Sequence, residues 1–313
     1  MKKIAVVGSL NIDHVLMVKD LPSRGETIIS KSYQLKCGGK GANQAAAIGR
    51  LGMEVVMIGK IGNDEAGSMQ IDSLNISQVN TNGIIIEKNQ KTGAAFITVD
   101  EESDNNIVLF SGANGNLNND DIDSKKKYIL DSDAVVLQME IPVETTGRVI
   151  NFAYENKKKI ILSLAPAREL DRRILGKVDF LMVNEVEIQF LCGTKFDINN
   201  INDSIISLRR YFKNNIIITL GEMGSVLIDS NDTLYRCPAN RVKAIDSTAA
   251  GDAFTGGFIF GLVESLSLRK CLEIGNAAGA LTVTKMGAQP SLPFRDELIK
   301  FLAGNNSKIE FDR

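Results

Sequence analysis

The chain has 313 residues, of which 44% are hydrophobic, so it can bury a full core as one large α/β domain or two smaller ones. Its 36 basic residues nearly balance 38 acidic ones, and the net charge of −2 provides no field that would gather nucleic acid or an anionic membrane. The single histidine, His14, argues against a Ser-His-Asp hydrolase and against a multi-histidine metal site.

The start of the chain and its cysteines indicate the compartment. The apolar run at 4–7 stops at Gly8 and Ser9, which is too short for a signal-peptide core, and no later run approaches the length of a membrane span. The four cysteines are widely spread without C-x-x-C spacing, which argues against zinc and disulfides and fits a reducing compartment. We expect the protein in the cytoplasm.

Continuous β-branched runs alternate with helical patterns along most of the chain. Such runs separated by helices predict an α/β fold with a doubly wound parallel sheet and helices on both faces. A strand at 4–8 is followed by a helix at 42–52 and by further strands at 55–62, 134–138, 159–165, 178–184 and 214–221.

Residues 13–36 and 92–110 do not follow this alternation of strands and helices. Both alternate apolar and polar residues at strand period and contain no helix pattern. They are interpreted as antiparallel strands that form a small β-sheet lid over the carboxyl edge of the parallel sheet, or else as an ordinary edge extension. The α/β body would comprise residues 1–12, 37–91 and 111–313. His14 would either touch a ligand or be a partly buried polar residue.

The segment Cys37-Gly38-Gly39-Lys40-Gly41-Ala42-Asn43-Gln44 leads directly into the Ala-rich helix. Glycines permit close backbone approach, and a helix N-terminus presents free N–H groups to ligand oxygens. The segment has the form of a ligand-binding turn, although simple helix-start geometry would explain it equally. Neither a Walker A loop nor the G-x-G-x-x-G fingerprint of a dehydrogenase is present.

A second segment, DSTAAGDAFTGGF at 246–258, places small residues before an apolar helix. Several backbone N–H groups could converge there on an anion, and Asp252 would lie in the first helical turn, where the dipole favours its ionised form. An ionised carboxylate beside an anion hole suits phosphoryl transfer to a hydroxyl, because it orients the attacking oxygen and accepts its proton. The structural alternative is an acidic residue that only complements the helix dipole.

Two further segments follow strands. Asn184-Glu185-Val186-Glu187 could hold a magnesium–phosphate unit through water, or could simply cap a helix. The segment at 219–224, TLGEMG, suits a nucleotide lying against backbone and equally suits a plain hairpin.

These segments resemble, in order and at matching distances, the ribokinase branch of the phosphofructokinase-B sugar kinases, over nearly the whole chain. The signature segments are GGKGANQAAAIGRLG at 38–52 and DSTAAGDAFTGGF at 246–258. The resemblance implies a ribokinase-like α/β body, a β lid that also makes the contact of a homodimer, and transfer of the γ-phosphate of ATP to a sugar hydroxyl.

The resemblance also implies residue roles. Asp252 matches the catalytic base, and the amides of Ala249, Ala250 and Gly251 match the anion hole. The sugar would be bound by Asn11, Asp13, Gly39, Lys40, Asn43, Glu140 and Asp252. Nucleotide or Mg²⁺ positions are matched by Asn184, Glu187, Thr219, Gly221, Gly224, Gly251 and Asn276. A loop that holds K⁺ is matched by Asp246, Thr248, Thr282, Lys285, Gly287 and Ser291.

The leading hypothesis is therefore phosphorylation of D-ribose at its 5-hydroxyl by ATP, with Mg²⁺ and K⁺. Ile12 and Cys37 depart from the commonest pattern of this branch at positions expected near the sugar, which raises deoxyribose as a rival, whereas Asn11 and Asp13 favour ribose. Fructose or a nucleoside remains an alternative within the class. A catalytically silent sugar-binding regulator is the alternative outside it, against which Asp252 and the anion hole argue.

Overall fold

The structure is a computed structural model that describes residues 3–102, 104–193, 197 and 201–304. Its strands are β1 (Lys3–Val7), β2 (Asn11–Met17), β3 (Ser32–Gly38), β4 (Glu54–Gly62), β5 (Asn80–Glu87), β6 (Gly93–Val99), β7 (Asn105–Phe110), β8 (Ala134–Leu137), β9 (Lys159–Ser163), β10 (Phe180–Asn184), β11 (Asn215–Thr219), β12 (Ser225–Ile228) and β13 (Leu234–Cys237).

Helices alternate with these strands. The α-helices are α1 (Lys40–Arg50), α2 (Glu65–Ile76), α3 (Asn119–Leu130), α4 (Val143–Glu155), α5 (Arg172–Leu175), α6 (Glu185–Cys192), α7 (Ile201–Arg209), α8 (Ala250–Val263), α9 (Leu268–Val283) and α10 (Arg295–Gly304), and the 3₁₀ turns are η1 (Gly112–Asn116), η2 (Gly221–Met223) and η3 (Gln289–Ser291). No helix in the described part of the chain is long and apolar enough to cross a membrane.

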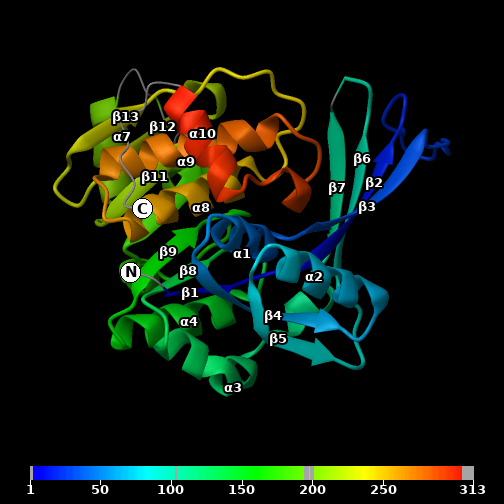
Figure 1. Ribbon diagram of the computed structural model, residues 1–313, viewed down its shortest axis with the longest axis horizontal. Coiled ribbons are helices and arrows are strands. Elements are labelled where there is room, and N and C mark those ends of the chain that lie inside the picture. The colour runs from blue at the N-terminus through cyan, green and yellow to red at the C-terminus, as the bar shows by residue number, and fades with distance from the viewer. Residues whose placement is uncertain (1–2, 103, 194–196, 198–200, 305–313) are drawn as a thin grey trace.

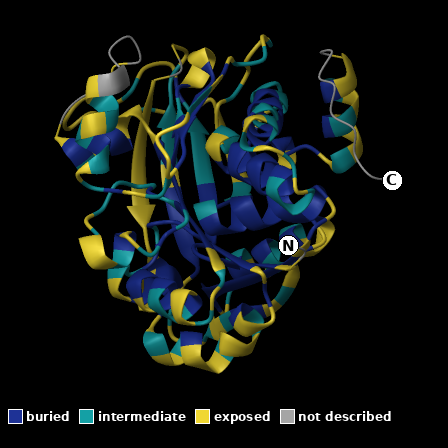
Figure 2. Ribbon diagram, turned by 90° about the vertical axis from the view of Figure 1, so that its left-hand side faces the viewer, coloured by how far each residue is buried: buried dark blue, intermediate teal, exposed yellow. Residues whose placement is uncertain are grey.

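The larger sheet has nine strands in the order β13-β12-β11-β10-β9-β8-β1-β4-β5, and it carries a separate hydrophobic core on each face. Alternation along β1 divides its side chains: Ile4 and Val6 join the core beneath α1, α8, α9 and α10, whereas Ala5 and Val7 join the core beneath α3 and α4. Figures 1 and 2 show the two helical layers and the buried strands between them. The predicted doubly wound α/β fold is confirmed.

Two strands of this sheet, β5 and β13, were not predicted, whereas β12 matches the hairpin interpretation of residues 219–224. β5 lies at one edge, and the hairpin β12–β13 closes the other edge antiparallel to β11. β13 (Leu-Tyr-Arg-Cys) is short and mixed in polarity, so it carries neither the apolar run of a central strand nor a clear alternation.

The smaller sheet has the order β3-β2-β6-β7, and its strands begin and end close to the bounds assigned to the lid. It extends away from the body beside α2 (Figure 1). The strand register places Asp13, Lys36 and Ala95 on one face and His14, Leu35 and Phe96 on the other. The sheet is therefore mixed, because β2 pairs parallel with β6 and antiparallel with β3, rather than purely antiparallel as predicted.

His14 and the four cysteines behave as ordinary structural residues. The His14 ring is partly buried, stacks on Phe96 with centroids 4.7 Å apart and forms a 2.8 Å hydrogen bond with the Tyr33 hydroxyl, on the lid face opposite Asp13. The cysteines are all unpaired, as their spacing predicted.

Candidate active site

A cavity of about 270 Å³ opens where the carboxyl ends of β9, β10 and β11 meet the start of α8. Ligands of doubly wound folds bind at this edge of the sheet. Eight of the predicted site residues line it, together with side chains such as Ser163 and Phe254: Lys40, Asn184, Glu187, Thr219, Ala249, Ala250, Gly251 and Asp252.

The turn before α8 leaves backbone N–H groups without partners. Ala249 adopts a left-handed conformation (φ 61°) and caps the helix, and the amide of Ala250 donates to the Ser247 carbonyl at 3.2 Å. The amides of Ala249 and Gly251 have no hydrogen-bond partner among the described residues. A side chain added at Gly251 would meet only open space, so the approach to these amides is unobstructed. Of the three predicted anion-hole amides, two are therefore available to an anion.

Asp252 lies in the first turn of α8 and is only 7% exposed. One carboxylate oxygen accepts from Asn43 Nδ2 at 3.0 Å and the other from Gln44 Nε2 at 2.9 Å. Burial raises the pKa of Asp252 above its ordinary value, while the charge of Lys40 and the two amide hydrogen bonds oppose the rise. The result is a carboxylate with a fixed orientation and an increased affinity for a proton.

Lys40, at the start of α1, is surrounded by acidic side chains. Burial alone would lower the pKa of Lys40, but the negative charges of Asp252, Glu140, Glu187 and Asp13 raise it. Glu140 is held beside it, because one carboxylate oxygen accepts from the Lys40 amide at 3.0 Å and from the Ser9 hydroxyl at 2.5 Å. The ammonium group therefore carries its charge throughout the physiological range.

The predicted sugar-binding residues gather at the base of the lid. Asn11 and Asp13 are 3% and 9% exposed, and burial, followed by the charge of Glu140, raises the pKa of Asp13 to about 7. The glycine turn is shaped to these residues: a Cβ on Gly38 would lie 2.1 Å from Asp13 Oδ2, and Gly39 (φ 86°) passes against the Asn11 amide. Helix-start geometry alone does not explain such close approaches.

The predicted nucleotide positions divide into two groups. Asn184 and Glu187 line the cavity and form a reciprocal capping box at the start of α6. The capping interpretation is confirmed, and the nucleotide role stays a prediction. Burial raises the pKa of Glu187. Gly221 and Gly224 lie outside the cavity lining, in the turn of the β11–β12 hairpin, where both have positive φ. The Asn276 amide donates to the carbonyls of Cys237 and Pro238 and so supports the chain after β13.

The predicted cation loop is tied together by one carboxylate. Asp246 accepts from the Thr248 amide and hydroxyl and, across the loop, from the Gly287 amide at 2.7 Å. Partial burial opposes the effect, but these hydrogen bonds lower the pKa of Asp246. The hydroxyls of Thr282 and Ser291 are buried and donate to nearby carbonyls, and the Lys285 ammonium pairs with Glu297 at the surface.

Comparison with known proteins assigns this arrangement of residues to a family. Residues 1–295 match the pfkB family carbohydrate kinases. The chain belongs to this family. The match includes the glycine turn, the cavity and the start of α8, which are the three features brought together in the structure.

Individual pfkB relatives cover almost the whole chain. The Haemophilus influenzae ribokinase is 36% identical over 305 residues (96% of this chain and 98% of the relative), and the Salmonella typhi deoxyribokinase is 34% identical over 304 residues (96% and 99%). The Arabidopsis thaliana ribokinase, solved as a complex with ribose and ATP, superposes with a TM-score of 0.88 at 28% identity and covers 99% of both chains.

In this pfkB kinase the two residues that depart from the commonest pattern, Ile12 and Cys37, share one face of the lid. Ile12 and Cys37 are paired across β2 and β3 on the lid face opposite Asp13, and the Cys37 thiol is 3.5 Å from the Met69 carbonyl of α2. The Cys37 side chain therefore packs against the body, and both side chains lie on the face that Asp13 does not share. Sheet alternation turns both side chains away from the face of Asp13, and the choice between ribose and 2-deoxyribose stays a prediction.

Asn114, which lies in η1, was not predicted as a site residue. Its side chain exchanges hydrogen bonds with the amide and carbonyl of Leu10 and donates to Asn11 Oδ1 at 2.8 Å. The hydrogen bonds with Leu10 join residues 104 positions apart in the sequence. Together with the bond to Asn11, a predicted sugar ligand, they connect η1 of the body to the base of the lid. The only sequence signal for Asn114 is its place in the polar, glycine-containing segment GANGN, between the lid strand β7 and helix α3.

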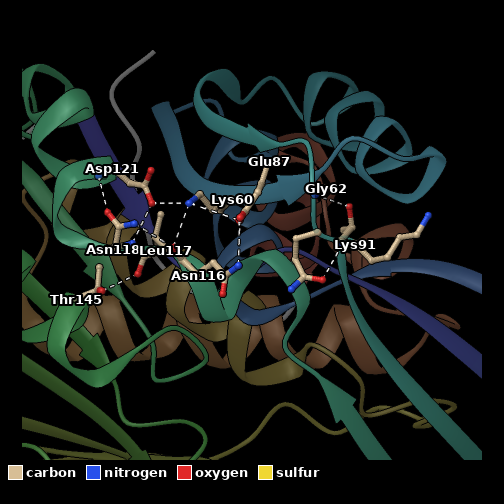
Figure 3. A network of polar contacts seen from close by, with 11 residues as sticks. Lys60, Gly62, Glu87, Lys91, Asn116, Leu117, Asn118, Asp121 and Thr145 are labelled. Carbon is tan, nitrogen blue, oxygen red and sulfur yellow. Dashed lines mark hydrogen bonds and ion pairs between the residues drawn. The ribbon is translucent and has the colours of Figure 1, made fainter.

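A buried lysine supports the loop that carries Asn114 (Figure 3). Lys60 of β4 lies 2.7 Å from Asp121 and 3.6 Å from Glu87, and its ammonium donates to the Asn116 carbonyl at the end of η1. Its side chain is 9% exposed, so the charge is kept inside the protein only with these partners. The network fixes η1 and, through it, Asn114.

Proposed function

We propose that this pfkB kinase is a ribokinase, which transfers the γ-phosphate of ATP to the 5-hydroxyl of D-ribose. The observation that carries the proposal is the buried, doubly hydrogen-bonded Asp252 carboxylate beside free amides at the start of α8. A sugar-binding regulator would have no use for a proton acceptor placed next to an anion site. The named relatives support ribose as the acceptor, and the similar identity to a deoxyribokinase keeps 2-deoxyribose as the rival to be tested.

The sugar would lie between the lid base and α8. Asn11, Asp13 and Glu140 offer oxygen acceptors to its hydroxyls, and Asn43 contributes an amide whose buried Oδ1 has no partner among the described residues. Because Gly39 has no side chain, its backbone can pass against that of Asn11 and hold the glycine turn beside the proposed sugar site. The same Asn43 amide donates to Asp252, so sugar recognition and base orientation share one side chain.

The chemical step would use Asp252 as the base. Its carboxylate orients the 5-hydroxyl toward the phosphorus and takes the proton as the new P–O bond forms and the bond to the ADP oxygen breaks. The loose transition state requires only modest basicity, which a carboxylate with raised pKa supplies. The amides of Ala249 and Gly251 and the nearby Lys40 ammonium would stabilise charge on the transferring group.

ATP would occupy the cavity edge at Asn184 and Thr219, with Gly221, Gly224 and Asn276 shaping the adjacent backbone. Mg²⁺ fits this site: no cluster of three or more His, Cys, Asp or Glu able to hold a metal occurs among the described residues, so the ion would be held mainly by phosphates and water, with Glu187 as the nearest carboxylate. Bound Mg²⁺ supplies neutralisation of phosphate charge.

K⁺ fits the loop tied by Asp246, because its donor set is oxygen from carbonyls, hydroxyls and one carboxylate. Asp246, Thr248, Thr282, Gly287 and Ser291 would hold it, with Lys285 contributing through its backbone. There the ion would supply positive charge beside the anion site.

The lid would form the contact of a homodimer. Its face opposite Asp13 exposes a set of large apolar side chains: Tyr33, Leu35, Phe96, Val108 and Phe110, each between 44% and 67% exposed. A continuous apolar face of this kind on a sheet indicates an interaction surface, and a second copy offers an identical one. The cytoplasmic location expected from the sequence stays a prediction.

The test is ADP release by the purified protein with ATP and a panel of ribose, 2-deoxyribose, fructose and nucleosides, each with and without K⁺. We expect the highest kcat/KM with ribose and activation by K⁺. A higher kcat/KM with 2-deoxyribose would replace the acceptor and keep the reaction. No acceleration by any acceptor would overturn the kinase assignment and favour the regulator.

A further inference from the structure

Two buried glutamine side chains link the sheet to Asp252 through hydrogen bonds. Gln138, directly after β8, donates through Nε2 to Gln44 Oε1 at 2.6 Å, and Gln44 of α1 donates through Nε2 to Asp252 Oδ1 at 2.9 Å. Both glutamines have no exposed surface. They come from separate elements, so the tertiary fold creates this link.

Stability alone does not account for these amides. Gln138 Oε1 is buried without a hydrogen-bond partner among the described residues, and such an orphan acceptor is costly. Room for it depends on Gly8, where a Cβ would lie 2.0 Å from that oxygen. An apolar side chain of the same size at position 138 would remove the free-energy cost of the unpaired oxygen. Buried polar groups that destabilise a fold in this way are typical of functional sites.

We propose that Gln44 and Gln138 are positioning residues that fix the orientation and the protonation state of the Asp252 carboxylate for catalysis. The inference rests on the proposed role of Asp252 as base. Gln138 acts one step further away: its N–H occupies Gln44 Oε1, so the amide of Gln44 must present its own N–H to the carboxylate.

The direction of the hydrogen bonds gives the mechanism. An amide does not titrate, so Gln44 and Asn43 each donate an N–H to one oxygen of Asp252 at every pH. Burial and the charge of Glu140 raise the pKa of Asp252, whereas the Lys40 ammonium and these two hydrogen bonds favour the ionised form. The remaining lone pairs are left to receive the proton of the substrate hydroxyl. Without Gln138, the Gln44 amide can rotate and place its oxygen against Asp252.

The experiment measures kcat and KM for ribose against pH in Gln44→Met, Gln138→Met and the double variant. We expect Gln44→Met to lower kcat about 10-fold or more with little change in KM, and to move the acidic limb of the kcat/KM profile to higher pH. Gln138→Met should shift the limb in the same direction by less. The double variant should match Gln44→Met alone, because Gln138 acts only through Gln44.

Gln289→Met is the matched control. Gln289 is equally buried and donates to a second glutamine, Gln70, but that chain ends on the carbonyls of Asn11 and Gly38, which do not titrate. Its removal should cost stability without moving the pH profile. If the methionine variants fail to fold, Gln44→Glu keeps the volume and places a carboxylate against Asp252, which should move the acidic limb upward still further.

The outcomes separate the two claims. An active wild-type protein whose pH profile is unchanged in the Gln44 variants, or additive effects in the double variant, would overturn this inference and leave the proposed function standing. An equal shift in Gln289→Met would also overturn it, because the shift would then report general loosening. A wild-type protein that phosphorylates no acceptor would overturn both.

Discussion

The body and the lid are both built on β-sheets, and they differ in what covers those sheets. All four residues of β8, at the centre of the body, are buried beneath helices on both faces, whereas all six residues of β7 in the lid are exposed. The body therefore derives its stability from its own helices. The lid leaves an apolar face without a partner inside the chain.

The candidate site also draws its residues from both the body and the lid. The body supplies Asp252, Lys40 and the free amides, which are held by helix starts and buried hydrogen bonds. The lid supplies Asn11 and Asp13 only from the buried base of β2, while its tip is exposed. The groups proposed for the chemical step thus lie on the body, and those proposed for sugar recognition lie at its junction with the lid.

The largest effect on activity is expected from a substitution in the body, at the proposed base Asp252. Asp252→Asn keeps the shape and loses the proton acceptor, so turnover should fall by roughly 10²-fold or more, with sugar affinity retained. Steady-state ADP release and calorimetric titration with ribose measure the two quantities. Asp229→Asn, which alters a buried carboxylate in the β12–β13 turn, is the control and should keep near-normal turnover. Equal losses in both variants would argue against Asp252 as base.

Asp13, at the junction of body and lid, should make the free energy of unfolding depend on pH. The folded-state pKa of Asp13 is raised from 3.8 to about 7, so the folded protein becomes less stable as the pH rises through this interval. Between pH 5 and pH 8 this group should lower the free energy of unfolding by roughly 2–3 kcal/mol. Denaturant unfolding of Asp13→Asn should lack that decrease. The same slope in variant and wild type would show that Asp13 is ionised throughout.

The body was the more predictable region because its signals are local. The apolar runs of β1, β4 and β8–β11 are continuous, and the small residues around Asp252 stand next to it in sequence. β13 carries no such pattern and was missed. Gln138 and Asn114 were missed for another reason: a glutamine after a strand or an asparagine in a loop gains its meaning from a partner about a hundred residues away.

The lid was predicted as strands, but the direction of its side chains was not. Alternation determines which residues share a face, and the strand register then decides which face meets the body. Ile12 and Cys37 were expected near the sugar from the family pattern, and the register places them on the lid face opposite Asp13. Adjacent positions along a strand therefore do not share a face of the sheet.

Substitutions at two neighbouring residues of β7 can test whether the exposed apolar face of the lid forms the dimer contact. Val108 lies on the apolar face opposite Asp13, and Ile107 lies on the other face at similar exposure. Val108→Lys should raise the dimer dissociation constant on the order of 10-fold or more, because a charge would be buried in place of about 1.5 kcal/mol of apolar contact. Analytical ultracentrifugation measures it. Ile107→Lys should leave the mass unchanged; a larger effect there would place the contact on the other face.

The smallest effect is expected at the cation loop, where body and lid touch. Gly287 is held by the Asp246 carboxylate, and the Lys36 side chain of β3 lies against it. Asp246→Ala removes three hydrogen bonds and the one carboxylate of the proposed donor set but leaves the carbonyl and hydroxyl oxygens. K⁺ should therefore still activate, but at a concentration a few-fold higher, about 1 kcal/mol.

Activity and thermal stability of this variant are measured against K⁺ concentration, with choline chloride holding ionic strength constant. Asp246 limits the freedom of the loop, so its loss should weaken the K⁺-dependent rise in unfolding temperature as well as the activation. If K⁺ raises neither quantity in the wild type, the loop binds no K⁺, and the Asp246 tether serves only to hold Gly287 beneath the lid. If only the activation weakens, the carboxylate acts on the anion site rather than on the ion.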